Sequence, residues 1–208
     1  MGNTLSKNNS CLKVFTLRDD KLVHYRETPL TMDEVKEIII KYPSILPFTR
    51  SKHCCVLRYV PLKEKYVDPV IVVKEKGGLD LYALYFDWYE MGSNAETAYP
   101  SLQEAYWSLG VQIEDVDEEL PYLSYEIWKS KSKQVRELRK TIREKLGIKR
   151  IKVNDAIAVI VVDKLTNRFK EVIDAVNEIT DTLVYAMELK AYRKNKEHIY
   201  IAQGYEWS

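Results

Sequence analysis

The sequence is poor in cysteine, glycine and proline and has no long apolar run. Among its 208 residues are three cysteines, Cys11 and the adjacent Cys54 and Cys55. An odd number with an adjacent pair does not suit a disulfide framework, so we expect reduced thiols and an intracellular, cytoplasmic protein. The apolar run over residues 156–162 is far shorter than the roughly 20 residues of a membrane-spanning helix. The N-terminus shows no secretory signal pattern, so we expect neither export nor a membrane span.

Charge is distributed unevenly, although 32 Lys and Arg nearly balance 31 Asp and Glu. Residues 77–128 contain eleven carboxylates and no Lys or Arg, whereas residues 129–152 contain eleven Lys or Arg and two Glu. Such asymmetry is typical of a face that binds polyanions. The alternative is that the two regions neutralise one another across the fold, and the sequence leaves both open.

Hydrophobic periodicity and turn residues predict an α/β fold, with a mixed β-sheet flanked by helices on both faces. We expect a flexible tail over residues 1–11 and one domain over 12–208, with any subdivision near 110–120. The predicted elements are two strands within 12–26, a helix from Thr31 to Pro43, a strand at 53–60, a hairpin at 67–89, helices at 101–109 and 131–146, and a strand–helix–strand tail at 156–162, 167–179 and 182–189.

The most informative segment is 67–89, where two β-rich runs flank Gly77-Gly78. Two glycines make a favourable two-residue hairpin loop, and in that register Asp68 lies directly opposite Asp87. Opposed residues have Cβ atoms roughly 4.5–5.5 Å apart, at which two carboxylates repel unless a cation lies between them. Oxygen pairs of this kind suit Mg²⁺ or Mn²⁺, which can activate water. Asp68 and Asp87 are therefore the predicted metal ligands.

A third carboxylate is predicted from the helix that starts at Thr31. Its apolar face contains Val35 and Ile39, and Glu34 lies at the edge of that face, so Glu34 is the acid expected to look inward. The alternative is that Glu34 completes a capping box with Thr31, because it stands three residues after a threonine N-cap.

The order of these motifs resembles the PD-(D/E)XK, or restriction-endonuclease-like, nuclease superfamily. Its members have a helix bearing Glu, then a hairpin with Asp on one strand and (Asp/Glu)-x-Lys on the next. The matching stretches here are 31–40, Val67-Asp68 and Asp87-Trp88-Tyr89, and 158–192 is similar to the βαβ unit that follows the core in many archaeal and bacterial members. Tyr89 stands where the family has lysine, and proline follows Asp68 instead of preceding it.

This resemblance implies a restriction-endonuclease-like core and Mg²⁺-dependent (or Mn²⁺-dependent) hydrolysis of DNA, with Glu34, Asp68 and Asp87 as catalytic residues. Tyr89 favours a second hypothesis, an inactive member of the fold that binds DNA or protein. A third is an N-myristoylated adaptor, since residues 1–6 fit the acylation pattern at Gly2. Asp181, Glu188 and Lys190 also form a D-x6-E-x-K string, but a single strand would hold these acids too far apart to share a metal. Glu188 and Lys190 are therefore expected at the surface.

The basic segment predicts the contact with nucleic acid. Its helix has a narrow apolar stripe and leaves most of its circumference to solvent, and exposed ion pairs contribute little. Against a phosphate backbone the same cations release counterions. The expected partner is therefore DNA, and a homodimer stays open. The residues predicted to contact phosphates are Lys131, Lys133, Arg136, Arg139, Lys140 and Arg143.

Overall fold

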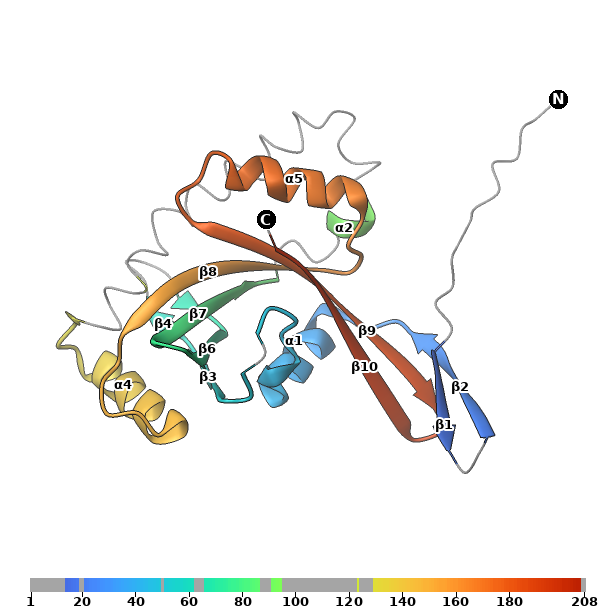
Figure 1. Ribbon diagram of the computed structural model, residues 1–208, viewed down its shortest axis with the longest axis horizontal. Helices are drawn as coiled ribbons and strands as arrows, with labels where there is room; N and C mark the ends of the chain where they lie inside the picture. The colour runs from blue at the N-terminus through green and yellow to red at the C-terminus, as the bar shows by residue number, and fades with distance from the viewer. Residues whose placement is uncertain are drawn as a thin grey trace. The chain divides into compact units, whose positions relative to one another are not determined.

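The protein is a mixed α/β structure, as the sequence predicts (Figure 1). The computed structural model describes residues 14–18, 21–49, 51–61, 66–86, 91–94, 123 and 129–206. The chain divides into two compact units, which are considered separately below. One comprises Met1–Leu30 with Lys190–Ile201, and the other comprises Thr31–Leu189 with Ala202–Ser208.

The smaller unit contains the two N-terminal strands expected within residues 12–26. Strands β1 (Val14–Arg18) and β2 (Lys21–Thr28) form an antiparallel hairpin. β2 then pairs antiparallel with residues 191–193 of β9 (Leu183–Lys194). The buried Tyr25 hydroxyl donates a 2.7 Å hydrogen bond to the Glu197 carboxylate, which links β2 to the start of β10 (Glu197–Tyr205).

The larger unit is built on a sheet that mixes antiparallel and parallel pairs. Strands β3 (Cys54–Leu57), β6 (Val70–Glu75) and β7 (Gly78–Tyr85) pair antiparallel in that order. β7 pairs parallel with β8 (Val153–Val162), and β8 pairs parallel with the first half of β9. The parallel βαβ tail is therefore confirmed. A separate two-stranded sheet consists of β4 (Val60–Pro61) and β5 (Tyr66–Val67).

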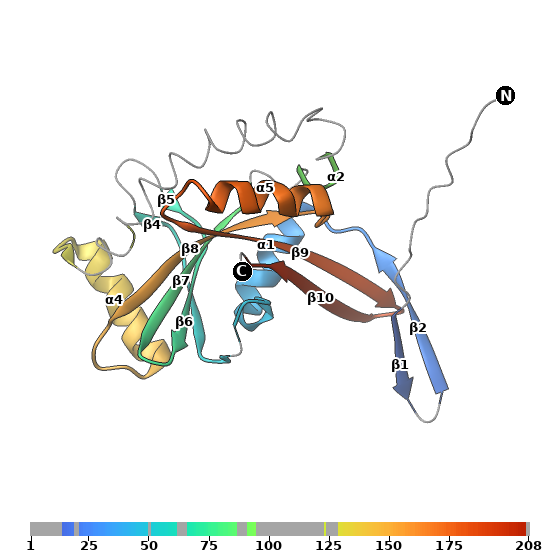
Figure 2. The same cartoon turned by 45° about the horizontal axis from the view of Figure 1, so that its top comes forward.

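Helices cover both faces of this sheet. Helices α4 (Lys133–Leu146) and α5 (Asn167–Asn177) lie on one face, and α1 (Met32–Lys41) lies on the other (Figure 2). Alternate strand residues explain this arrangement, because one set packs with α4 and α5 in a continuous core. That core includes Val72, Leu81, Ile160, Ala186, Ile142 and Phe169. None of the described helices is long and apolar enough to cross a membrane.

Side-chain caps and a glycine set the helix ends. Thr31 caps α1 as predicted, whereas α4, predicted from residue 131, begins at Lys133 because Ser132 caps it by accepting the Val135 N–H. Gly147 ends α4 in the left-handed conformation, at φ +59°, as predicted. Two short elements complete the described fold, the 3-10 helix η1 (Pro43–Ile45) and α2 (Met91–Asn94). The helix expected at 101–109 lies outside the described residues.

The hairpin forms, but its loop is not the predicted pair of glycines. Glu75 pairs with Gly78, so the two-residue loop is Lys76-Gly77, with φ +98° at Gly77. Gly78 belongs to β7, where a Cβ atom would lie 2.3 Å from the Asn154 Oδ1 atom. The second glycine therefore permits the close approach of the chain entering β8, which is why the Gly77-Gly78 prediction is wrong.

Candidate functional site

The observed register changes the geometry expected around Asp68. The β6–β7 ladder ends where Val70 pairs with Ala83, and the Leu84 N–H donates to the Pro69 carbonyl at 3.2 Å. Extended by two residues, this register places Asp68 level with position 85. The register that predicts a directly opposed Asp68–Asp87 pair is therefore wrong, and Asp87 itself lies outside the described residues.

Asp68 is already surrounded by cations and donors from its own unit. The Arg58 guanidinium donates to both carboxylate oxygens, with an Nη2–Oδ2 distance of 2.9 Å. The Lys36 Nζ lies 3.4 Å from Oδ2, and the Tyr59 N–H donates to Oδ1 at 3.3 Å. Burial by itself would raise the pKa of Asp68, but the Arg58 and Tyr59 hydrogen bonds and the Lys36 charge outweigh it and lower that pKa. The Asp68 carboxylate is therefore engaged in ion pairs and hydrogen bonds within its own unit.

Glu34 is a capping residue on the surface. Its Oε2 accepts the Thr31 N–H at 2.8 Å, and the Thr31 Oγ1 accepts the Glu34 N–H at 3.3 Å. These reciprocal bonds confirm the capping-box alternative, and the backbone hydrogen bond is the main reason that the pKa of Glu34 is lowered. The expectation that Glu34 looks inward is wrong. Within the described part of the chain, no three His, Cys, Asp or Glu side chains gather closely enough to hold a metal ion.

Glu188 is buried, which corrects the prediction that it lies at the surface. Its side chain sits near the middle of β9, and the residue is 3% exposed. Oε2 accepts the Leu165 N–H at 2.8 Å and so fixes the chain between β8 and α5. Nearby, the Asp163 carboxylate accepts the Ser93 N–H at 2.9 Å. The sequence carried a sign that Glu188 is buried, because this acid stands inside an apolar, β-rich run. Polar groups in such surroundings need a hydrogen-bond partner.

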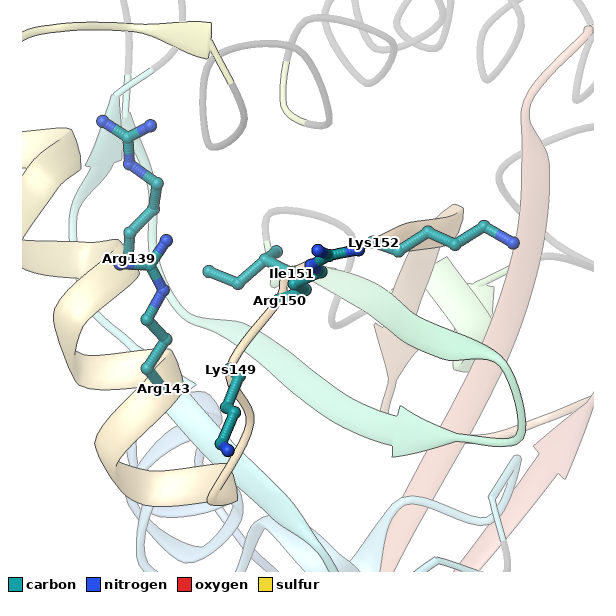
Figure 3. Close-up of a pocket in the computed structure, with 6 residues that line it drawn as sticks. All are labelled: Arg139, Arg143, Lys149, Arg150, Ile151 and Lys152. Carbon is teal, nitrogen blue, oxygen red and sulfur yellow. The ribbon is translucent and has the colours of Figure 1, made fainter.

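A recess of about 380 Å³ lies between α4 and the segment that enters β8 (Figure 3). We call this the basic recess, because five of its six lining residues are cationic. Arg139 and Arg143, four residues apart, extend from the same flank of α4. The residues that line the basic recess are Arg139, Arg143, Lys149, Arg150, Ile151 and Lys152.

The fold fixes both walls of the basic recess. Helix α4 docks through Val135, Ile142 and Leu146, which turns the arginine flank toward the following segment. After Gly147 that segment is anchored by the buried Ile151. The Lys152 carbonyl then accepts the Leu79 N–H at 2.8 Å, which joins the segment to β7. The cations therefore project from backbone that is held in place.

Among the described residues, most of the cations in the basic recess have no partner. Arg139 is partly committed, because its Nη2 donates to the Ser130 carbonyl at 2.7 Å. Within the described residues, the side chains of Arg143, Lys149, Arg150 and Lys152 form no hydrogen bond or ion pair, and all four residues are exposed. Repulsion among these cations would be relieved by a bound anion.

Two of the six predicted phosphate-contacting residues, Arg139 and Arg143, line the basic recess. Lys131, Lys133, Arg136 and Lys140 are exposed elsewhere on or just before α4, and Lys140 lies 3.8 Å from Glu144 in an exposed ion pair. The sequence prediction missed the contribution of residues 149–152. Their signal was the run Lys149-Arg150-Ile151-Lys152, which begins two residues after the helix-ending glycine and in which a single apolar residue interrupts three cations.

Comparison of the chain with known protein families, with characterised proteins and with solved structures finds no significant match.

Proposed function

We propose that this protein binds nucleic acid through the basic recess and the exposed flank of α4. The observation that carries the proposal is the grouping of Arg143, Lys149, Arg150 and Lys152 around one recess, where they have no partner among the described residues. Internal pairing of exposed charges contributes only about 0–1 kcal/mol per pair. Neutralising phosphates releases counterions instead, and this is the main source of affinity in non-specific binding.

The arginines suit a phosphate ligand better than a ligand with a carboxylate surface. Guanidinium groups offer several donors in a plane and bind phosphate oxygens in a bidentate manner. Arg139 and Arg143 present two such groups on one side of α4, and Lys149 and Lys152 of the following segment add point charges. A nucleic-acid backbone that follows the helix would meet both the guanidinium and the ammonium donors.

We further propose that the chain is a degenerate member of the restriction-endonuclease-like superfamily that binds without cleaving. The order of helix α1, hairpin β6–β7 and the β8–α5–β9 unit supports the family resemblance. The bidentate Arg58–Asp68 pair supports the loss of catalysis, because a metal ion would have to displace Arg58 and Lys36 from that carboxylate. Tyr89 in place of the family lysine agrees with this proposal.

The test is a salt titration of DNA binding by the wild type and by the triple variant Arg143→Gln, Arg150→Gln, Lys152→Gln. Each lost phosphate contact lowers the slope of log affinity against log salt by about 0.9 on duplex DNA and about 0.7 on a single strand. We expect a fall in slope of about 2 to 3 units and a thermal midpoint close to that of the wild type.

The matched control is Lys52→Gln, Lys194→Gln, Lys196→Gln, which removes the same charge from exposed positions outside the basic recess. Its slope should change by much less than that of the recess variant. Equal slopes for the two triple variants would contradict the proposal. Cleavage of DNA that requires added Mg²⁺ or Mn²⁺ and disappears in Asp68→Asn would instead support the nuclease hypothesis, which stays a prediction.

A further inference from the structure

Two exposed tyrosines flank the small β4–β5 sheet in the larger unit. Tyr59 precedes β4 and is 58% exposed, and Tyr66 begins β5 and is 62% exposed. The register of this sheet pairs Val60 with Val67 and Pro61 with Tyr66, so both rings belong to one short ribbon whose valines are buried. The ribbon therefore presents its aromatic side chains to solvent while its apolar side chains anchor it.

Tyr59 is held in an unusual backbone conformation. Its φ of +52° lies in the left-handed region, which costs a residue with a side chain roughly 1–2 kcal/mol. Both backbone groups are satisfied, since the N–H donates to Asp68 Oδ1 at 3.3 Å and the carbonyl accepts from Gln134 Nε2 at 3.2 Å. These contacts thus hold the backbone from which the exposed Tyr59 ring projects. Strain of this kind is concentrated at functional positions.

Tyr59 lies beside a cation and close to the start of the basic helix. The Arg58 guanidinium lies 5.3 Å from the centre of the Tyr59 ring, and the carboxylates that act on Arg58 and Lys36 here are those of Asp68 and Glu37. Gln134, which bonds to Tyr59, stands in the first turn of α4. The 14 residues of α4 span about 21 Å and end beside the basic recess. One helix therefore joins the tyrosines to the cations of the basic recess.

We infer that Tyr59 and Tyr66 are a stacking platform for unpaired bases, so that the nucleic acid bound by this protein is single-stranded. The inference rests on the proposed function and specifies its ligand. A duplex keeps its bases stacked inside, whereas a single strand can place bases on exposed aromatic rings while its phosphates follow a basic groove. Here the backbone would run along the cationic flank of α4 toward the basic recess.

The experiment measures fluorescence anisotropy of a labelled single strand of about 16 nucleotides and of the matched duplex. We expect the wild type to bind the single strand more tightly. Tyr59→Asn should weaken that binding roughly tenfold or more, since stacking contributes strongly to each base bound. Its salt slope should not change, because tyrosine carries no charge. Asparagine is chosen because it tolerates the left-handed backbone and removes only the ring.

Three further variants make the result specific. Tyr59→Phe keeps the ring and should bind like the wild type, and Tyr66→Thr should weaken binding of the single strand without altering the strained backbone at position 59. Tyr42→Asn is the matched control: Tyr42 is 47% exposed and has Lys41 5.2 Å from its ring centre, but it caps α1 on the other face of the sheet. Its affinity should equal that of the wild type.

The outcomes separate this inference from the proposed function. Equal affinity of the wild type for duplex and single strand, or an unchanged affinity in both Tyr59→Asn and Tyr66→Thr, would overturn the stacking inference. If the basic-recess variant still loses binding in that case, the proposed function stands alone. Failure of the wild type to bind either nucleic acid would overturn both.

Discussion

The two ends of α4 use the same residue types for different purposes. Near its start, Arg58 and Lys36 surround Asp68, whose side chain is 12% exposed. Near its end, Arg143 and Arg150 line the basic recess with no carboxylate partner among the described residues. Cations at the first end hold the fold together, and those at the second end are available to a ligand. The number of basic residues in a segment therefore says less than the position of the acids.

This difference also accounts for the weakness of the catalytic hypothesis. Carboxylates act as metal ligands or bases when their environment leaves them accessible and poised. Asp68 instead has its pKa lowered by internal donors, and Glu34 is engaged in the capping box. Both predicted acids in the described part of the chain have structural roles that the local geometry explains.

The largest expected effect is a difference in the free energy of unfolding between variants at the two ends of α4. Arg58→Ala leaves the mostly buried Asp68 carboxylate without its bidentate partner, which we expect to lower the free energy of unfolding by about 1–3 kcal/mol. Arg143→Ala removes an exposed cation that has no described partner, so its effect should stay within about 0.5 kcal/mol. Urea denaturation of both variants measures the difference.

A double variant sharpens this comparison. Arg58→Ala combined with Asp68→Ala removes both partners, so part of the stability lost in Arg58→Ala should return. If Arg143→Ala destabilises the protein as much as Arg58→Ala, the cations of the basic recess are also structural. The contrast between the two ends of α4 would then fail.

Local signals were sufficient to predict most of the fold. Thr31 and Glu34 predicted the start of α1, Gly147 predicted the end of α4, and the apolar run at 156–162 predicted a buried strand. Each of these features depends on residues close in sequence. The hairpin register was wrong because Gly78 is required by Asn154, a contact across 76 positions that no local pattern reveals.

The candidate site was less predictable for the same reason. The basic helix was evident, but the second wall of the basic recess required knowing that residues 149–152 turn back beside Arg143 before entering β8. The partner of Asp68 was equally hidden, because Arg58 reaches it only after β4 and β5 bring the two segments together. Tertiary pairing decides which charges are neutralised.

A smaller effect should appear in the pH dependence of stability. The pKa of Asp68 is lowered below its ordinary value of 3.8, so its stabilising contribution is fully present above that value and is lost as the pH falls through the lowered pKa. Asp68→Asn should therefore be less stable than the wild type near neutral pH. The difference in thermal midpoint should shrink once the pH is below about 4. A difference that is constant with pH would mean that the ion pairs of Asp68 do not contribute to stability.

The smallest expected effect concerns Asp80, on the face of β7 that points away from α4. Burial raises its pKa, the charges of Asp155 and Glu75 raise it further, and the 3.2 Å hydrogen bond from Asn154 only partly compensates. A raised pKa means that the folded state favours the protonated acid, so stability is lost as the pH rises through the ordinary pKa of 3.8 and the raised one. Asp80→Asn should therefore raise the thermal midpoint slightly at neutral pH and not at low pH, while the salt slope of nucleic-acid binding stays unchanged. A lower midpoint at neutral pH would show that the ionised Asp80 is stabilised, and that acids as well as cations on this sheet have structural partners.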